Sequence, residues 1–189
     1  AATGRRKYFD LYPITFREFL AATSEEKILE YINSFSFDSP NYTEYFHNKV
    51  NEFLHKYIRL GGMPKLLDIY LDASSDKRKI SEYIKDISIT IEENIKTILG
   101  EKAKLYEYED ILRKIAYFSM NTLKFSHLQV QHAGRSEAKR LVSKTTGARV
   151  IHKIRLFESL NDLSKYIIFD CGIANYLING SDLLGTQIP

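Results

Sequence analysis

The sequence is poor in the residues that cross-link a chain or interrupt its helices. Its 189 residues include a single cysteine, Cys171, four prolines and nine glycines, and there is no tryptophan. One cysteine excludes an internal disulfide, which favours a reducing, cytoplasmic location. The scarcity of glycine and proline favours long helices over many short strands. We therefore expect a mostly helical, cytoplasmic protein.

Several patterns that mark membrane segments or catalytic sites are also absent. No apolar run approaches the roughly 18 residues of a membrane span, and no signal peptide opens the chain, so no membrane association is expected. There is no G-x-x-x-x-G-K-[ST] loop to hold a triphosphate and no G-x-S-x-G nucleophile motif. The five histidines lack metal-binding spacing. This chain alone is therefore predicted to have no catalytic residue, metal site or cofactor.

Positive charge is concentrated in one part of the chain. Between residues 110 and 155, ten lysines and arginines stand against only two acidic residues, Asp110 and Glu137, whereas the rest of the chain carries more acidic than basic residues. Such an asymmetry indicates two parts with different surroundings.

Capping signals mark the start of the helical region. A short strand is predicted from Tyr8 to Tyr12. Thr15 and Glu18 have the spacing of a capping box, which predicts a helix that starts at Phe16. Thr23 and Glu26 repeat that spacing ahead of a second predicted helix.

Two longer helical patterns follow. Apolar residues recur with helical spacing from Tyr42 to Leu60, and Gly61-Gly62 is placed to end that helix. Pro64 suits the first turn of a further helix that is predicted from Lys65 to about Ala73. The aromatic residues between 42 and 57 follow the helical period, so we expect them in the core and not on a surface that stacks bases.

The most regular pattern in the chain is a stripe of isoleucines with helical spacing, predicted to form one long helix that ends at Gly100. Such a stripe can pack in the protein's own core or form a coiled-coil seam with a second copy. The core is favoured, because coiled coils need the heptad sustained for longer. The stripe consists of Ile80, Ile84, Ile87, Ile91, Ile95 and Ile98.

The elements expected after residue 100 have the order of a winged helix-turn-helix domain. They are a helix at 108–118, a short ambiguous segment at 125–130, a helix at 136–146, strands at 150–157 and 166–169, and a last helix at 173–178. The predicted fold is therefore a helical bundle followed by a winged helix with a small β-hairpin.

The helix expected at 136–146 has the pattern of a DNA-reading helix. Its apolar side is formed by Ala138, Leu141, Val142 and Thr145, which leaves the basic residues on the outer side. In a major groove, basic residues would contact phosphates, and Arg140 is placed to read a guanine edge. A solvated basic face that contacts another protein is an equal alternative. The candidate nucleic-acid-binding residues are Lys124, Arg135, Lys139, Arg140, Lys144, Arg149 and Lys153.

Four short motifs occur in the order seen in one known family. They are Gly4-Arg5-Arg6 with Leu11-Tyr12-Pro13-Ile14-Thr15-Phe16-Arg17-Glu18-Phe19, then Gly61-Gly62-Met63-Pro64-Lys65, then the segment from Arg135 to His152, and finally Phe169-Asp170-Cys171-Gly172-Ile173. In these motifs the chain resembles the predicted AAA+ superfamily ATPases of archaea and bacteria that carry a C-terminal domain of unknown function. Lys65 departs from the family, which usually has glutamate there.

The resemblance implies a middle segment of a larger ATPase. Residues 1–100 would be its helical lid-like region, 101–180 its winged helix, and 181–189 the start of a linker to a missing nuclease-like domain. The parent protein would bind ATP and Mg²⁺, and Arg5 and Arg6 would lie where a guanidinium can sense the nucleotide. The segment would couple nucleotide state to DNA or a protein partner. The alternative is a free-standing winged-helix transcription regulator that dimerises through its helical part.

Overall fold

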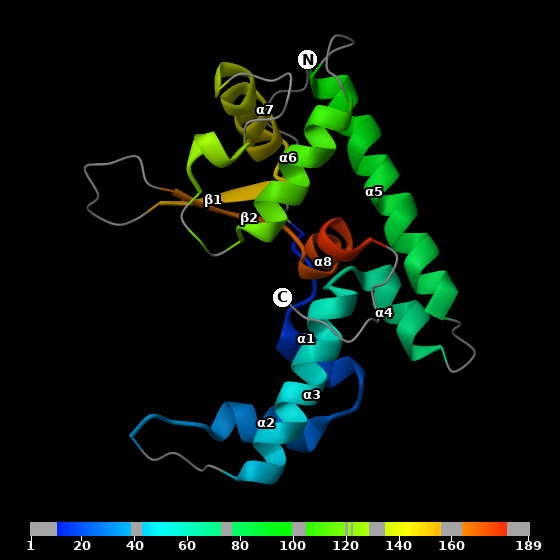
Figure 1. Ribbon diagram of the computed structural model, residues 1–189. Coiled ribbons are helices and arrows are strands. Elements are labelled where there is room, and N and C mark those ends of the chain that lie inside the picture. The colour runs from blue at the N-terminus through cyan, green and yellow to red at the C-terminus, as the bar shows by residue number, and fades with distance from the viewer. Residues whose placement is uncertain are drawn as a thin grey trace, which may run out of the picture.

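The computed structural model describes residues 11–38, 43–72, 77–99, 105–119, 121, 123–128, 135–155 and 164–180. This part of the chain is mostly helical and contains one two-stranded antiparallel hairpin (Figure 1). Its elements are α1 (Phe16–Ala22), α2 (Glu26–Ser34), α3 (Glu44–Leu60), α4 (Pro64–Leu71), α5 (Lys77–Leu99), α6 (Leu105–Tyr117), the 3₁₀ helix η1 (Phe125–Leu128), α7 (Arg135–Gly147), β1 (Ile151–Arg155), β2 (Ser164–Ile168) and α8 (Cys171–Asn179).

The capping box predicted at the start of α1 is confirmed. The backbone N–H of Glu18 donates to the Thr15 hydroxyl over 3.3 Å, and the Glu18 carboxylate accepts from the Thr15 N–H over 2.7 Å. These bonds satisfy donors that every helix leaves unpaired at its N-terminus. They also lower the pKa of Glu18, the backbone bond most.

One local prediction near α1 is wrong, and another is tested only in part. Thr23 does not cap α2, whose N-cap is Glu25 without a side-chain bond. Thr23 instead ends α1, and its hydroxyl donates to the carbonyls of Phe19 and Leu20. The strand expected at 8–12 is not formed in its described part, residues 11 and 12, and the rest of it lies outside the described residues.

Helices α3 and α4 form where the periodicity predicts them. Gly61 ends α3 with φ +81°, a left-handed conformation that favours glycine, and Pro64 occupies the first turn of α4. The aromatic residues of α3 divide between core and surface. Phe53 is buried, but Tyr45 is 64% exposed, so the expectation of a core position is wrong for that residue.

The buried apolar residues form two clusters. The N-terminal cluster lies among α1–α5, and the C-terminal cluster among α6, η1, α7, the hairpin and α8. The N-terminal cluster consists of Phe19, Leu20, Ile28, Phe53, Leu60, Leu66, Leu67, Ile80 and Ile84. The C-terminal cluster consists of Tyr108, Ile111, Leu112, Ile115, Ala116, Leu123, Leu128, Ala138, Leu141, Val142, Ile151, Tyr166, Ile168 and Ile173.

Helix α5 joins the two clusters. Ile80 and Ile84 are buried in the N-terminal cluster, and Ile87 and Ile91, one and two turns further on, pack against the C-terminal cluster. The helix runs along one side of the molecule from α4 to α6 (Figure 1). The isoleucine stripe is therefore packed within the chain over these four residues, as favoured from the sequence; the side chains at 95 and 98 lie outside the described residues.

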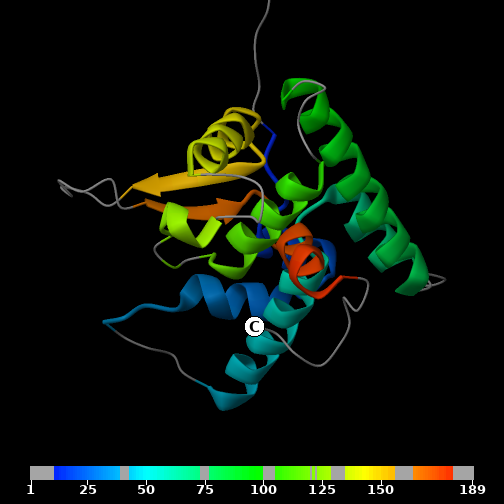
Figure 2. The ribbon, with the colours of Figure 1, turned by 45° about the horizontal axis from the view of Figure 1, so that its top comes forward.

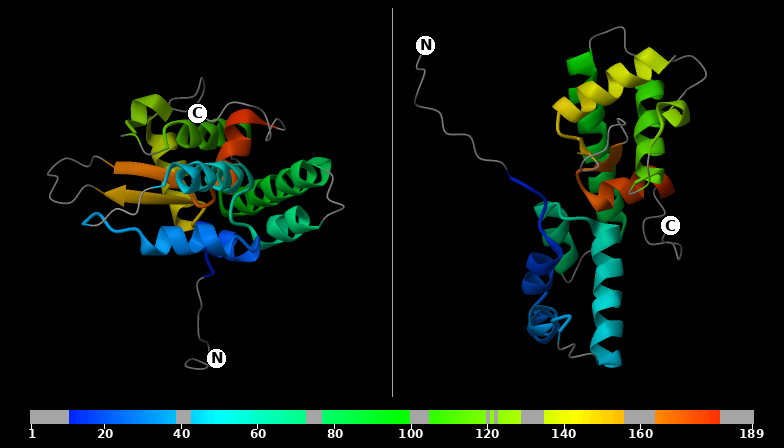
Figure 3. Two further views of the ribbon diagram at one scale, coloured as in Figure 1. Left: turned by 90° about the horizontal axis from the view of Figure 1, so that it is seen from below. Right: turned by 90° about the vertical axis from the view of Figure 1, so that its left-hand side faces the viewer.

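The hairpin packs against both α6 and α7, and all of them share the C-terminal cluster. Strands β1 and β2 pair antiparallel, with Ile151 opposite Ile168 and Arg155 opposite Ser164. Helix α7 lies along β1, and α6 lies against β2 (Figure 2). Helices α1, α2 and the first turns of α3 lie at the opposite end of the molecule from α7 (Figure 3). Helix α7 is thus remote from these N-terminal helices.

Helix α8 connects the hairpin to α3 through a buried carboxylate. Asp170 is the N-cap of α8, where its Oδ1 accepts from the N–H of Ile173 over 3.0 Å. Its Oδ2 accepts from the backbone N–H of Gly62 over 2.7 Å, immediately after α3. A methyl group at Gly172 would overlap the Leu60 carbonyl oxygen, so the first turn of α8 lies directly on the end of α3.

The segment that precedes α1 meets the same place. The backbone N–H of Ile14 donates to the Gly62 carbonyl over 2.7 Å, and the Tyr57 hydroxyl donates to the Ile14 carbonyl over 2.6 Å. We call these five residues, Ile14, Tyr57, Gly62, Asp170 and Gly172, the junction. Three of the four motifs singled out in the sequence thus meet at one point. The predicted boundary near residue 100, between a helical lid-like region and a winged helix, stays a prediction.

Candidate nucleic-acid interface

Helix α7 has the two-sided construction expected from its sequence. Its inner side packs on η1, β1 and α5. The hydroxyl of Thr145, a buried polar group on that side, donates to the Leu141 carbonyl over 2.7 Å, so it is buried without losing a hydrogen bond. The four residues predicted to point inward are all buried: Ala138, Leu141, Val142 and Thr145.

The outer side of α7 carries three exposed basic residues, Lys139, Arg140 and Lys144. We call these three residues the basic face. Ser136 and Ser143, also exposed, lie on the same side of the helix. The helix therefore presents positive charge to solvent on the side opposite its apolar residues, as predicted.

Arg140 is held by a carboxylate from the preceding turn. Its Nε donates to Glu137 Oε2 over 2.9 Å, and its Nη2 donates to Glu137 Oε1 over 2.6 Å. These hydrogen bonds lower the pKa of Glu137 and raise that of Arg140. This pair is not among the contacts expected from the sequence, although its spacing of three residues on a helix is a recognisable signal.

Lys139 lies toward η1. Its Nζ is 5.5 Å from the centre of the Phe125 ring, which is within the range of a cation–π contact. Phe125 in turn contacts Tyr166 of β2 edge-on, so this aromatic ring is fixed by the hairpin. The ammonium group of Lys139 therefore lies over the Phe125 ring of η1.

The remaining candidate residues lie outside the basic face. Lys124, exposed, directly precedes η1, and Arg149, also exposed, has a left-handed backbone with φ +60° just after α7. Lys153 is half-buried on β1. Arg135 is the first residue of α7, but its side chain is outside the described part of the chain. Arg5 and Arg6 also lie outside the described residues.

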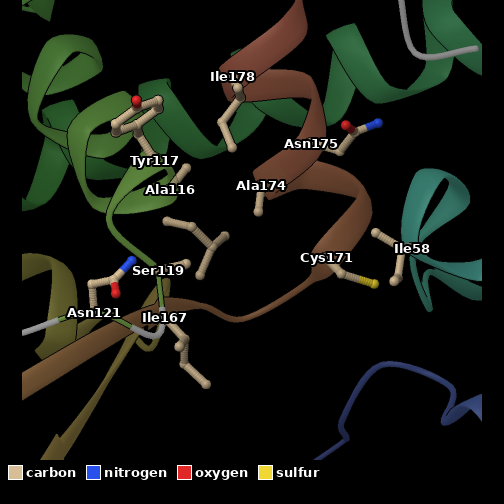
Figure 4. Close-up of a pocket in the computed structure, with 11 residues that line it drawn as sticks. Ile58, Ala116, Tyr117, Ser119, Asn121, Ile167, Cys171, Ala174, Asn175 and Ile178 are labelled. Carbon is tan, nitrogen blue, oxygen red and sulfur yellow. The ribbon is translucent and has the colours of Figure 1, made fainter. Parts of the chain in front are cut away.

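A pocket of about 570 Å³ lies between α3, α6, β2 and α8 (Figure 4), and its lining includes no residue of the basic face. Most of its lining is apolar, with Ile58 on one side and Ala174 and Ile178 on another. Its thiol, Cys171, is half-buried, and its Sγ lies 3.7 Å from the Tyr57 carbonyl. Burial raises the pKa of Cys171 to about 12, so the thiol stays protonated at neutral pH and is a poor nucleophile.

Two kinds of feature are absent from the described part of the chain. No three histidine, cysteine or acidic side chains in that part of the chain are grouped so that they could hold a metal ion. None of the described helices combines the length and the apolar character that crossing a membrane requires.

The described chain is a mostly helical protein with a small hairpin and one helix that is basic on its outer side. Residues 51–184 match the sequence profile of a family described as a domain of unknown function (DUF8612), and the chain belongs to this family. No curated protein and no solved structure matches the chain. The matched residues include Gly62 and Asp170 of the junction and the whole of α7. The likeness to AAA+ ATPases stays a hypothesis.

Proposed function

We propose that the part of the chain from α6 to β2 is a winged helix that binds double-stranded DNA through α7. The observation that carries the proposal is the basic face, which lies opposite the buried side of the helix. The order α6, η1, α7, β1, β2 supports it, because a winged helix places its recognition helix directly before the hairpin.

The chemistry of this contact is mainly electrostatic. Lys139 and Lys144 flank the outer side of α7 and would each lie near a phosphate when the helix enters a major groove. Lysines that neutralise phosphates release bound counterions, so the affinity falls as salt rises. Lys124, just before η1, and Arg149, just after α7, would extend the same contact along the DNA backbone.

We further propose that the helical part transmits the state of an ATPase core to this winged helix. The resemblance to AAA+ ATPases supplies the core, and ATP and Mg²⁺ would belong to it. The junction supports the transmission: Ile14, which follows the segment resembling the exit from such a core, is bonded to Gly62, and Gly62 is bonded to Asp170. A displacement of residue 14 would therefore reach α8 and the hairpin through two hydrogen bonds.

The DNA proposal is tested by removing two charges from α7. Wild type and a variant with Lys139→Gln and Lys144→Gln are titrated with a fluorescent duplex of random sequence between low and physiological salt. We expect wild type to bind at low salt with a steep salt dependence. The variant should bind more weakly, and the slope of log K against log salt should be shallower by about 2, because each phosphate contact contributes about 0.9.

The matched control carries Lys79→Gln and Lys85→Gln, which remove the same charge from exposed positions on α5. It should bind like wild type apart from a small uniform loss. Equal effects of the two double variants would mean that net charge, and not the basic face, causes the binding. If wild type binds no duplex even at low salt, the basic face contacts a protein partner instead and the proposal fails.

A further inference from the structure

We propose that Glu137 is a positioning residue that holds Arg140 for contact with a guanine in duplex DNA; this inference rests on the proposed function. The carboxylate of Glu137 accepts two hydrogen bonds from the guanidinium, at Nε and Nη2. Both side chains are partly open to solvent, with 35% of Glu137 and 41% of Arg140 exposed. The pair therefore lies where a duplex against the basic face would meet it.

The bonds to Glu137 leave the reading edge of Arg140 available. A guanidinium has five N–H donors, one on Nε and two on each terminal nitrogen. Glu137 occupies the edge formed by Nε and Nη2. The other edge, formed by Nη1 and the second hydrogen of Nη2, is a pair of donors that matches O6 and N7 of guanine. Arg140 can thus be held by Glu137 and donate to a guanine at the same time.

Holding the side chain favours base reading over phosphate binding. An arginine whose orientation is already restricted loses less rotamer freedom when it binds, which strengthens a contact that depends on direction. The negative charge of Glu137 also repels phosphates, so it weakens binding to DNA of arbitrary sequence. Glu137 should therefore raise the preference for guanine while it lowers the general affinity.

The pair contributes little to the fold, so it can be altered without unfolding α7. An exposed ion pair between residues three apart on a helix adds only a small stability. Glu137→Gln keeps the size of the side chain and removes its charge. The control is Glu52→Gln, which removes a carboxylate that pairs with Lys49 and Lys56 on α3, remote from α7.

In the experiment, the duplex that wild type prefers is selected from a random pool. Its guanines are then replaced one at a time by 7-deazaguanine, which lacks N7. We expect one replacement to weaken wild-type and Glu52→Gln binding about tenfold, because it removes one of the two hydrogen bonds that the charged guanidinium donates to that guanine. For Glu137→Gln the same replacement should have an effect of about twofold or less, whereas its affinity for random-sequence duplex should equal or exceed that of wild type.

The outcomes separate this inference from the proposal beneath it. If wild type binds duplex but no guanine replacement weakens binding, or if Glu137→Gln keeps the full tenfold effect, the inference is overturned and the DNA-binding proposal stands. If Glu137→Gln loses affinity for every duplex equally, Glu137 has only a structural role and the inference is again overturned. If wild type binds no duplex, both fail together.

Discussion

Asp170 shows how one buried charge joins distant parts of the chain. The residue is only 2% exposed, yet its two oxygens accept hydrogen bonds from Gly62 and Ile173, the first of these 108 residues away in sequence. Burial raises the pKa of the Asp170 carboxyl, and the backbone hydrogen bonds oppose that rise without cancelling it. A carboxylate in such a site stabilises the junction at a cost in hydration.

Because the pKa of Asp170 is raised in the folded state, the free energy of unfolding depends on pH. Since the folded state binds the Asp170 proton more tightly than the unfolded chain, this group's contribution is greatest below the unfolded pKa of about 3.9 and falls as pH rises through the folded pKa. Asp170→Asn removes this titration and turns one accepting oxygen into a donor that faces an N–H, at a cost of about 1–3 kcal/mol. Urea unfolding of both proteins should show the largest gap near pH 4 and a smaller gap at pH 7. A gap that is constant or widens with pH would contradict the raised pKa.

Among the elements, α8 and α7 offer two glycines whose replacement should have opposite effects. Alanine favours a helix over glycine by roughly 1 kcal/mol. At Gly147 an added methyl group meets no atom within 4 Å, so Gly147→Ala should leave stability unchanged or raise it.

At Gly172 the methyl group would overlap the Leu60 carbonyl, and the main chain must move. Gly172→Ala should therefore lower the free energy of unfolding by about 1–3 kcal/mol in a denaturant titration, as overpacking does. A stable Gly172→Ala variant would show that α8 does not lie on α3 as described.

The starts of α1 and α2 also show how far a capping signal in the sequence predicts where a helix begins. Thr15 and Thr23 both have the capping-box spacing, but only Thr15 caps a helix. At Thr23 the hydroxyl bonds to carbonyls at the end of α1, and Ser24 takes a left-handed backbone with φ +59°. The spacing identifies groups that can pair, whereas the choice between ending one helix and starting the next depends on where the chain turns. Periodicity over many residues, as in α3, α5 and α7, is less easily overridden.

At the scale of the whole molecule, the sequence predicts the sides of the helices but not how distant segments meet. The buried and exposed sides of α7 follow from its period, so most of the candidate interface could be predicted. The pairing of Gly62 with Asp170 could not, because nothing local to either residue specifies a partner 108 positions away. The motifs around both residues are visible in the sequence, and in the structure the two motifs are hydrogen-bonded to each other at the junction.

The two apolar clusters should lose stability together, because α5, α8 and the junction connect them. Ile84 is fully buried in the N-terminal cluster, so Ile84→Ala should cost about 2–5 kcal/mol. Hydrogen exchange measured by mass spectrometry should then show faster exchange both in α3 and in the hairpin, although only α3 belongs to the damaged cluster. Ile89→Ala is the control, since Ile89 lies on the same helix but is 42% exposed, and it should change neither region appreciably. If Ile84→Ala accelerates exchange in α3 and leaves β1 and β2 at wild-type rates, the two clusters unfold independently, and the junction is too weak to transmit a change from residue 14 to the hairpin.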